Sequence, residues 1–221
     1  MAALPPAPDS QRLALGWVHV GPGCLVVDKP SGLLSVPGRG EDKQDCALHR
    51  VQARFPEALV VHRLDMATSG LLVFARSPAV QRELSDAFAG RQVEKRYVAV
   101  LGGVLATDDQ LIDLPLVTDW PNRPRQMVCP ERGKPSQTRL RVLSRDELAR
   151  TTRVELTPYT GRSHQLRVHC LALGHPILGD ALYAPPELLA AAPRLLLHAC
   201  ALGLPATSLE GALALASPPP F

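Results

Sequence analysis

The feature that most restricts the fold of this chain is a group of polar side chains placed directly before a buried strand. His62, Arg63 and Asp65 lie within four residues. Thr68–Gly70 then has the composition of a turn, and Leu71–Ala75 is an apolar run of strand length. A carboxylate at the edge of a core strand is either held by its neighbours or used in chemistry. In the first case Asp65 accepts hydrogen bonds from the backbone N–H groups of its own turn, and the local spacing leaves both readings open.

The composition is that of a globular protein with one core. The chain has 221 residues, of which 46% are hydrophobic and 20% are charged. Its five cysteines are odd in number and include no Cys-x-x-Cys pair, which indicates neither a disulfide framework nor a metal site. The first residues lack the basic start of a signal peptide, and the longest stretch without a formal charge, Leu195–Leu209, is too short to cross a bilayer. We therefore expect a cytoplasmic protein without a bound metal.

Charge is unevenly distributed, although the net charge is only +3. Between Arg123 and Arg145 there are seven Lys or Arg residues and one acid, Glu131, whereas Leu101–Asp119 holds four Asp and no base. This pattern predicts one positive and one negative surface. The plainer alternative is that each run is only a solvated face. Any attraction to nucleic acid has to come from such local clusters, because the net charge excludes a generally basic protein.

Strand signals outnumber helix signals along the chain. One helix is expected to begin at Ser77–Pro78 and to end at Gly90, with Ser77 as the N-cap. A second is expected over Ser163–Leu173, followed by Gly174. Because helices join few of the strands, the fold class should be α+β with a largely antiparallel sheet. The expected strands, in chain order, are Cys24–Asp28, Leu71–Ala75, Lys95–Leu101, Gln137–Leu143, Thr152–Thr157, Leu195–Leu204 and Leu213–Ala216.

Several motifs make this chain resemble the RluA-type pseudouridine synthases. The segment His62–Leu71 reads H-R-L-D-x-x-T-S-G-L, which is the signature of that family. A chance match to three motifs, in the family's order and at the family's separations, is much less probable than a chance match to one of them. The other matching segments, in chain order, are Lys29–Gly32, Ser35–Gly38, Glu94–Ala99, Gly161–His169 and His175–Asp180.

The resemblance implies a single catalytic domain over residues 16–221. Its fold would be a mixed, mostly antiparallel sheet split by a central RNA-binding cleft, and the Pro- and Ala-rich residues 1–15 would form a flexible tail. Many relatives carry a small S4-type RNA-binding module before the strand that begins here at Cys24. Only 23 residues precede Cys24, so we expect no S4 module and expect the catalytic domain to recognise RNA alone, as a monomer.

The segment Asp119–Pro124, D-W-P-N-R-P, looks closer to the short RluA subgroup than to the family at large. That likeness implies dual specificity, for the tRNA anticodon stem-loop and for a hairpin of 23S rRNA. The same chemistry on only one of these RNAs, or on another RNA, remains an alternative reading.

The resemblance assigns Asp65 as the catalytic nucleophile. Pseudouridylation breaks the bond between ribose C1′ and uracil N1, turns the base and rejoins it through C5. No atom is added and no redox change occurs, so the reaction needs a nucleophile and no cofactor. Attack at C1′, attack at C6 of the ring and removal of a sugar proton all remain open. The target uridine has to be flipped out of the RNA to reach Asp65.

Six other residues are expected to support Asp65 or to bind substrate. Burial favours a neutral acid, so an adjacent cation should keep Asp65 ionised, and the resemblance points to Arg162 in G-R-S-H-Q. Tyr97, the aromatic of the family's K-x-Y motif, would stack on the uracil. Lys95 should share its strand face. Arg63 could insert into the gap that the extruded base leaves.

His62 and Leu166 complete this set of six. We expect His62 to bond within its own turn rather than to shuttle protons, and Leu166 to lie on the apolar face of the second helix. Two of the six also have plainer readings. Arg162 could be a surface arginine at a helix start, and Tyr97 could be an ordinary core residue.

Other classes of protein fit the sequence less well. A glycosidase would need a second carboxylate as its acid, and no partner motif is evident. An RNA-binding protein without catalysis should have lost Asp65, Tyr97 or Arg162, and all three are present. Neither G-x-S-x-G nor G-x-x-x-x-G-K-[ST] occurs, which argues against a serine hydrolase and a P-loop nucleotide-binding protein.

Overall fold

Ten strands of this protein form one continuous sheet. The structure, a computed structural model, describes residues 14–221, so nearly all of the tail expected over residues 1–15 lies outside the described residues. The strands of the sheet are β1 (Gly16–Val20), β2 (Cys24–Lys29), β3 (Leu59–Val60), β4 (Ser69–Ala75), β5 (Glu94–Gly102), β6 (Asp109–Asp113), β9 (Gln137–Asp146), β10 (Thr151–Pro158), β11 (Leu197–Leu204) and β12 (Leu213–Ala216).

The order of the strands across the sheet is β1-β2-β4-β11-β5-β10-β9-β6, with β12 beside β11 and β3 beside β4. Only β11 and β4 run parallel among the paired strands that the structure describes; the other pairs are antiparallel. The predicted α+β class with a mixed, mostly antiparallel sheet is therefore confirmed. The α-helices are α1 (Ala47–Gln52), α2 (Pro78–Ala89), α3 (Gln165–Ala172) and α4 (Pro186–Ala190).

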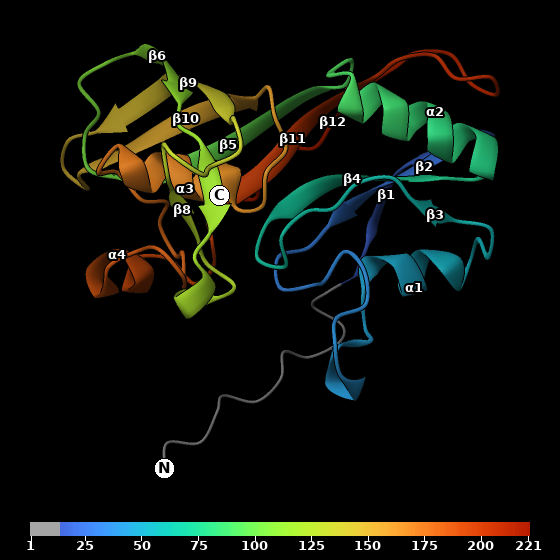
Figure 1. Ribbon diagram of the computed structural model, residues 1–221, viewed down its shortest axis with the longest axis horizontal. Coiled ribbons are helices and arrows are strands. Elements are labelled where there is room, and N and C mark those ends of the chain that lie inside the picture. Colours follow the sequence, from blue (N-terminus) through green and yellow to red (C-terminus); the bar gives the residue numbers. More distant parts are fainter. Residues whose placement is uncertain (1–13) are drawn as a thin grey trace.

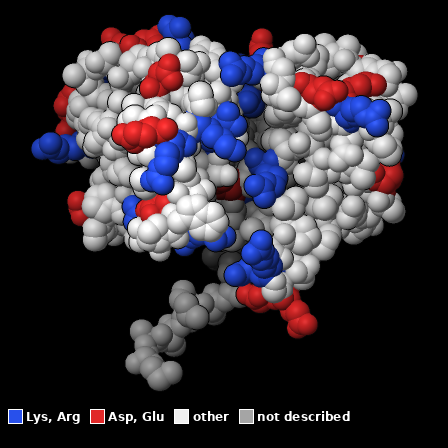
Figure 2. All heavy atoms as spheres, in the orientation of Figure 1, with Lys and Arg blue, Asp and Glu red and all other residues white. Residues whose placement is uncertain are grey.

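The sheet carries two halves that meet at β11 and β4. In Figure 1, β5, β6, β9 and β10 lie with α3 and α4 on one side, and β1, β2 and β4 lie with α1 and α2 on the other. Each half has its own packed core: Leu101, Leu156 and Leu166 belong to the first, and Val73 and Leu84 to the second. Figure 2 shows a groove between the halves, with Lys and Arg side chains on both of its rims and an acidic side chain deep within it.

Helix α2 follows the sequence prediction closely. The Ser77 hydroxyl accepts a hydrogen bond from the Val80 N–H at 3.2 Å, and Gly90 ends the helix. Val80 and Leu84 are buried against β4. Each such side chain stabilises the fold by roughly 1.5–3 kcal/mol through burial alone, which fixes the helix over one face of the strand that follows Asp65.

Some elements differ from the expectation. The helix expected over Ser163–Leu173 begins only at Gln165, because His164 adopts the left-handed conformation (φ 54°) and cannot be part of a right-handed helix. The strand expected from Leu195 begins at Leu197. The short elements were not foreseen, since they are only two to six residues long and tertiary contacts supply most of their stability. They are β1, α1, β3, β6, β7 (Leu116–Thr118), β8 (Gln126–Val128) and α4.

The acidic and basic segments do not form two separate surfaces along their whole length. Strand β6 pairs with β9, which brings Arg139 to Asp109 at 2.8 Å; Arg145 also contacts Asp108 at 2.5 Å. These ion pairs neutralise part of both segments. Other members of the basic segment, Arg123 among them, lie in and around the hairpin of β7 (Leu116–Thr118) and β8 (Gln126–Val128).

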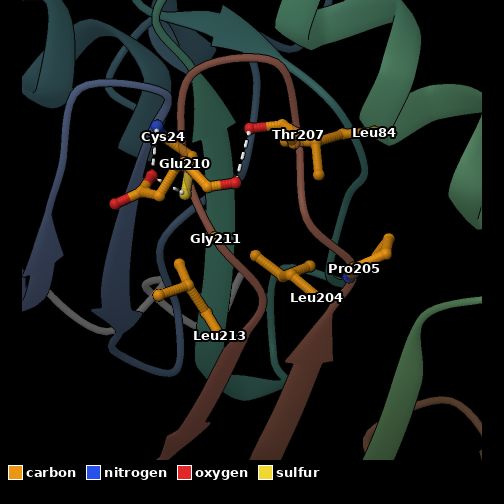
Figure 3. Close-up of a pocket in the computed structure, with 8 residues that line it drawn as sticks. All are labelled: Cys24, Leu84, Leu204, Pro205, Thr207, Glu210, Gly211 and Leu213. Atoms are coloured by element: carbon orange, nitrogen blue, oxygen red, sulfur yellow. Dashed lines mark hydrogen bonds between the residues drawn. The ribbon is translucent and has the colours of Figure 1, made fainter.

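The C-terminal segment contributes the last strand of the sheet and a loop that contacts β2. Strand β12 pairs with β11, as expected for Leu213–Ala216. The loop before it lines a pocket with Cys24 and Leu84, and there the Glu210 carboxylate accepts a hydrogen bond from the Cys24 N–H at 3.1 Å (Figure 3). None of the helices that the structure describes has the length and hydropathy needed to cross a membrane.

Candidate active site

Asp65 lies in the loop between β3 and β4, and its side chain is 28% exposed. Its Oδ2 atom accepts a hydrogen bond from Nη1 of Arg167 at 3.3 Å, and Nε2 of His164 lies 3.9 Å from the same oxygen. Among the described residues, no hydrogen bond is recorded to Oδ1. One carboxylate oxygen is thus held by a cation, and the other is available for a substrate.

The turn that Asp65 forms uses its backbone rather than its side chain. The Thr68 N–H donates to the Asp65 carbonyl oxygen at 3.1 Å. The carboxylate itself turns away from these N–H groups and contacts a helix more than 100 residues further along the chain. The reading in which the carboxylate only caps its own turn therefore does not describe this site.

A buried carboxylate, that of Asp180, holds the Arg167 side chain in place. Its Nε and Nη2 atoms donate to the two carboxylate oxygens of Asp180 at 2.8 and 2.6 Å. Asp180 also accepts the backbone N–H groups of Leu182 and Tyr183, and the Arg167 and Asp180 side chains are almost fully buried. A forked arginine–carboxylate pair fixes the plane of the guanidinium, so Nη1 is held in one direction, toward Asp65.

His164 is held between Asp65 and the β7–β8 hairpin. The Gln126 N–H donates to the Tyr183 hydroxyl oxygen at 2.8 Å, and that oxygen lies 2.7 Å from Nδ1 of His164. The Tyr183 hydroxyl donates its own hydrogen to Nδ1 of His164. The neutral imidazole therefore carries its hydrogen on Nε2, the atom that faces Asp65. Burial lowers the pKa of His164, and the charge of Arg167 also lowers it against the opposing effect of Asp65. The ring is therefore a neutral neighbour of the carboxylate at pH 7.

Two segments near the N-terminus, Lys29–Gly32 and Ser35–Gly38, bond to the backbone of the Asp65 loop. The fully buried Lys29 ammonium donates to three carbonyl oxygens, of which Met66 O is one, at 2.8–3.1 Å. The Ser35 hydroxyl donates to Leu64 O and accepts from Leu64 N. Burial lowers the pKa of Lys29 to about 7, while the charge of Asp65 acts in the opposite direction. These contacts fix the backbone on both sides of the carboxylate.

The glycine of the Thr-Ser-Gly turn is required by the neighbouring strand. Gly70 has φ 112°, and a Cβ at this position would lie 2.3 Å from the carbonyl oxygen of Ala199 on β11. The adjacent Ser69 hydroxyl lies 2.8 Å from Nδ1 of His198. The parallel pairing of β4 with β11 thus depends on a residue without a side chain, and it seats the Asp65 loop where the two halves of the sheet meet.

Two of the predicted residues, Tyr97 and Lys95, lie on β5, and a third, His62, contacts the same phenylalanine ring as Lys95. Tyr97 on β5 packs against both halves of the core, and burial and the charge of Asp65 raise its pKa. Lys95, two residues earlier, has its ammonium 5.9 Å from the centre of the Phe88 ring. His62 also stacks on Phe88 and accepts a hydrogen bond from the Val73 N–H at 3.2 Å. Burial lowers the pKa of His62 to about 3, and the ring accepts its hydrogen bond from β4 rather than from its own turn.

The other three predicted residues are placed differently from one another. Arg63 is exposed, and no contact is recorded for its guanidinium among the described residues. Leu166 is buried in the core under β5 and β10. Arg162 is exposed, and its Nε donates to the carbonyl oxygen of Pro135 at 3.3 Å. The arginine that pairs with Asp65 is Arg167 instead: it lies on α3 and reaches Asp65, whereas Arg162 lies at the surface before the helix begins.

Sequence reasoning missed Arg167, Asp180, Tyr183 and Lys29 as members of the site. A signal was present, since Arg167 and Asp180 stand in the matched segments among apolar neighbours. An arginine and an aspartate that are both placed at buried positions need each other to offset desolvation. That requirement could have selected Arg167 over Arg162, although not the contact with Asp65.

The chemistry that this arrangement can perform is nucleophilic. A carboxylate with one oxygen held by a fixed guanidinium and one oxygen open to a groove can attack an electrophilic carbon or accept a proton. A second carboxylate near it, Asp180, is fully engaged with Arg167 and two backbone N–H groups. The pair therefore lacks the free acid that a glycosidase requires.

Comparison with known proteins identifies the family. Residues 23–172 match the model of the family described as RNA pseudouridylate synthase. The chain is 59% identical over 175 residues to a Dual-specificity RNA pseudouridine synthase RluA from Yersinia pestis, covering 79% of this chain and 84% of that protein. The protein of the same name from Pasteurella multocida is 50% identical over 207 residues, covering 94% of each chain.

Solved structures agree with these sequence matches. The structure of Human RNA Pseudouridylate Synthase Domain Containing 1 superposes with a TM-score of 0.81 and 32% sequence identity, covering 97% of this chain and 87% of that chain. Human RNA Pseudouridylate Synthase Domain Containing 4 gives a TM-score of 0.73 at 27% identity, covering 93% and 88%.

Proposed function

Because this chain belongs to the RNA pseudouridylate synthase family, as an RluA-type member that isomerises uridines in RNA, we propose that Asp65 is its nucleophile and that Arg167 orients it. The observation that carries this proposal is the single contact of the carboxylate: Oδ2 meets a buried guanidinium at 3.3 Å, and Oδ1 has no recorded partner among the described residues. Such an acid is both fixed and unoccupied.

The reaction follows from this geometry. The target uridine leaves its helix or loop and enters the groove, at a cost of a few kcal/mol for unstacking. Asp65 then acts on C1′, on C6 or on a sugar proton, and the bond from C1′ to N1 breaks. The base turns, C5 bonds to C1′, the C5 proton leaves and N1 gains a proton. All heavy atoms of the uridine are retained, and the proton that leaves C5 is balanced by the one that N1 gains, so these steps use no cofactor.

Three further residues contact the RNA in this proposal, and three others support the site. Tyr97 forms an aromatic face beside Asp65 for the flipped uracil. Arg63, exposed and two residues before the nucleophile, fills the gap in the RNA. Arg162 lies at the surface near Pro135 and contacts the RNA backbone rather than the nucleophile. Lys95, His62 and Leu166 support the strands and helix around the site by their packing.

For the substrate, we propose dual specificity, for a tRNA anticodon stem-loop and a hairpin of 23S rRNA. Dual specificity is supported by the names of the relatives from Yersinia pestis and Pasteurella multocida. The choice of these two RNAs is supported by the likeness of the D-W-P-N-R-P segment to the short RluA subgroup. We further propose that residues 16–221 act as one catalytic domain, as a cytoplasmic monomer.

The nucleophile is tested by release of tritium from C5-labelled uridine in RNA. Asp65→Asn should release none, whereas Arg63→Ala should retain activity on a short single strand and lose it on folded RNA. Normal release by Asp65→Asn would refute the assignment.

The substrate is tested by mapping pseudouridine in tRNA and rRNA from cells with and without the gene. Dual specificity predicts that one position disappears from each RNA and that both return with the wild-type gene. If a position is lost from only one RNA, the enzyme has a single substrate class.

A further inference from the structure

The most exposed large aromatic side chain in the described part of the protein is Trp120, at 68% exposure. It stands in the short 3₁₀ turn Trp120–Asn122, at the tip of the β7–β8 hairpin. Burying a tryptophan would stabilise the fold by a few kcal/mol, so a tryptophan kept in solvent contributes little to the fold in its present position.

The tip that carries Trp120 is held in one shape. The Asn122 amide donates to both carboxylate oxygens of Asp119 at 3.2 and 3.0 Å. Backbone hydrogen bonds close the loop between Asp119 and Arg125 and between Arg125 and Asn122. The Arg123 guanidinium lies 4.4 Å from the centre of the Trp120 ring. The indole is therefore presented at a fixed angle, with a cation against it and much of its surface open.

The same tip is connected to the active site by two hydrogen bonds. The backbone N–H of Gln126, in the strand pair nearest the loop, donates to the Tyr183 hydroxyl oxygen. That hydroxyl contacts His164, which lies beside Asp65. Arg125 also lies over the Tyr183 ring, 5.3 Å from its centre. Figure 1 places the hairpin on the half of the molecule that carries α3. An RNA that delivers a uridine to Asp65 continues on both sides of that uridine, so its neighbouring nucleotides lie over the surface around the site.

On the basis of the proposed function, we propose that Trp120 is a stacking site for an unpaired nucleobase of the substrate RNA, a few nucleotides from the flipped uridine. An exposed indole takes any base on its face, and stacking of this kind contributes substantially to the binding of single-stranded nucleic acid. Arg123 adds a charge that meets the adjoining phosphate. The site would favour loops over duplexes, since bases in a duplex are not available to stack on it.

A direct test is possible because the chain has only two tryptophans, Trp17 and Trp120. Trp17 packs on Phe55 and beneath Arg54, so Trp17→Phe keeps an aromatic ring there and leaves Trp120 as the one fluorescent reporter. With Asp65→Asn added to prevent turnover, the protein is titrated with an RNA hairpin that carries the target uridine in its loop. Binding is followed in parallel by the anisotropy of a dye on the RNA.

Stacking predicts that Trp120 emission is quenched in step with binding. It also predicts that an abasic nucleotide at one loop position abolishes the quenching and weakens binding about tenfold. Unchanged emission at saturating RNA, with every abasic position, would overturn the proposal. This outcome differs from failure of the proposed function, which would appear as the absence of pseudouridine in every RNA given to the wild-type enzyme.

A second measurement uses the active enzyme and does not depend on the reporter variant. Trp120→Ala should raise KM for the hairpin about tenfold with little change in kcat, and Trp120→Tyr should restore most of the loss. Leu148→Ala is the matched control, because this side chain is 97% exposed in the turn between β9 and β10. Equal KM values for Trp120→Ala and Leu148→Ala would also overturn the proposal.

Discussion

Two carboxylates in this protein each join distant parts of the chain, but they differ in what their oxygens contact. Glu210 is only 11% exposed; its Oε1 lies 2.6 Å from Nε2 of His19, and its Oε2 accepts from the Cys24 N–H and thiol at 3.1 and 3.4 Å. Asp65 uses one oxygen for Arg167. One acid is saturated with partners, and the other has an oxygen left for chemistry.

The surroundings of Glu210 explain why it stays structural. Burial and, to a smaller extent, the charge of Glu210 together raise the pKa of the Cys24 thiol to about 12, so the thiol keeps the proton that it donates. The three donor atoms of His19, Cys24 and Glu210 lie within 4.8 Å of one another and are of types that can bind a metal, yet here they satisfy one another. A titratable cluster indicates reactivity only when a group in it remains free.

The largest expected effect tests the free oxygen of Asp65. Asp65→Asn keeps the shape of the side chain but removes the nucleophile, and pseudouridine formation should fall by at least about 10³-fold. Glu210→Gln removes the same charge from the saturated cluster and should leave kcat within about twofold. Rates measured with tritium-labelled RNA check both, and a loss of activity in Glu210→Gln equal to that in Asp65→Asn would break the comparison.

The next effect concerns the cation on the held oxygen. Arg167→Lys keeps a charge but loses the fork to Asp180, so the ammonium no longer points in one direction. We expect kcat to fall about 10- to 100-fold, with folding largely preserved in circular dichroism. Arg162→Lys is the matched control in the same segment and should change kcat by less than about threefold. The opposite ranking of these two variants would return the role to Arg162.

A smaller effect, on stability alone, is expected at the saturated carboxylate. Glu210→Gln leaves the Cys24 thiol and His19 without a charged acceptor, which should lower the free energy of unfolding by about 1–3 kcal/mol. Urea unfolding measures this change. Asp65→Asn should unfold at nearly the wild-type urea concentration, because its carboxylate has only one hydrogen bond to lose. Stability loss in Asp65→Asn larger than in Glu210→Gln would contradict the assignment of the two roles.

The smallest effect, for a step of one pH unit, is a pH dependence of stability from Lys29, which holds the loop that carries Asp65. Its pKa is about 7 in the folded chain and 10.5 in the reference state, so between these pH values the unfolded chain binds more protons. Stability should therefore rise with pH across this window, by up to about 1.4 kcal/mol per pH unit. Lys29→Met should remove this dependence on pH. Urea unfolding of both proteins at pH 7, 8 and 9 measures it, and an equal rise of the free energy of unfolding with pH in the wild type and in Lys29→Met would refute the prediction.

Several parts of the fold were predictable because local chemistry decides them. Ser77, Pro78 and Gly90 set the ends of α2, and apolar runs of strand length gave β4 and β11. The start of α3 was not predictable, since the left-handed conformation of His164 depends on contacts with Tyr183 and Asp65 that lie outside its own segment. The ion pairs between β6 and β9 were missed for the same reason, because pairing between strands 30 residues apart cannot be seen in a local charge pattern.

The amino-acid sequence by itself determined the family and the positions of the longer strands along the chain, and it singled out Asp65 as the candidate nucleophile, because these depend on motifs and on local periodicity. Only the tertiary structure decided which arginine meets Asp65. A helix faces the groove with one side, and whether Arg162 or Arg167 occupies that side depends on where the helix begins and on the buried Asp180 that orients the guanidinium. The partner of a charge is a property of packing in three dimensions.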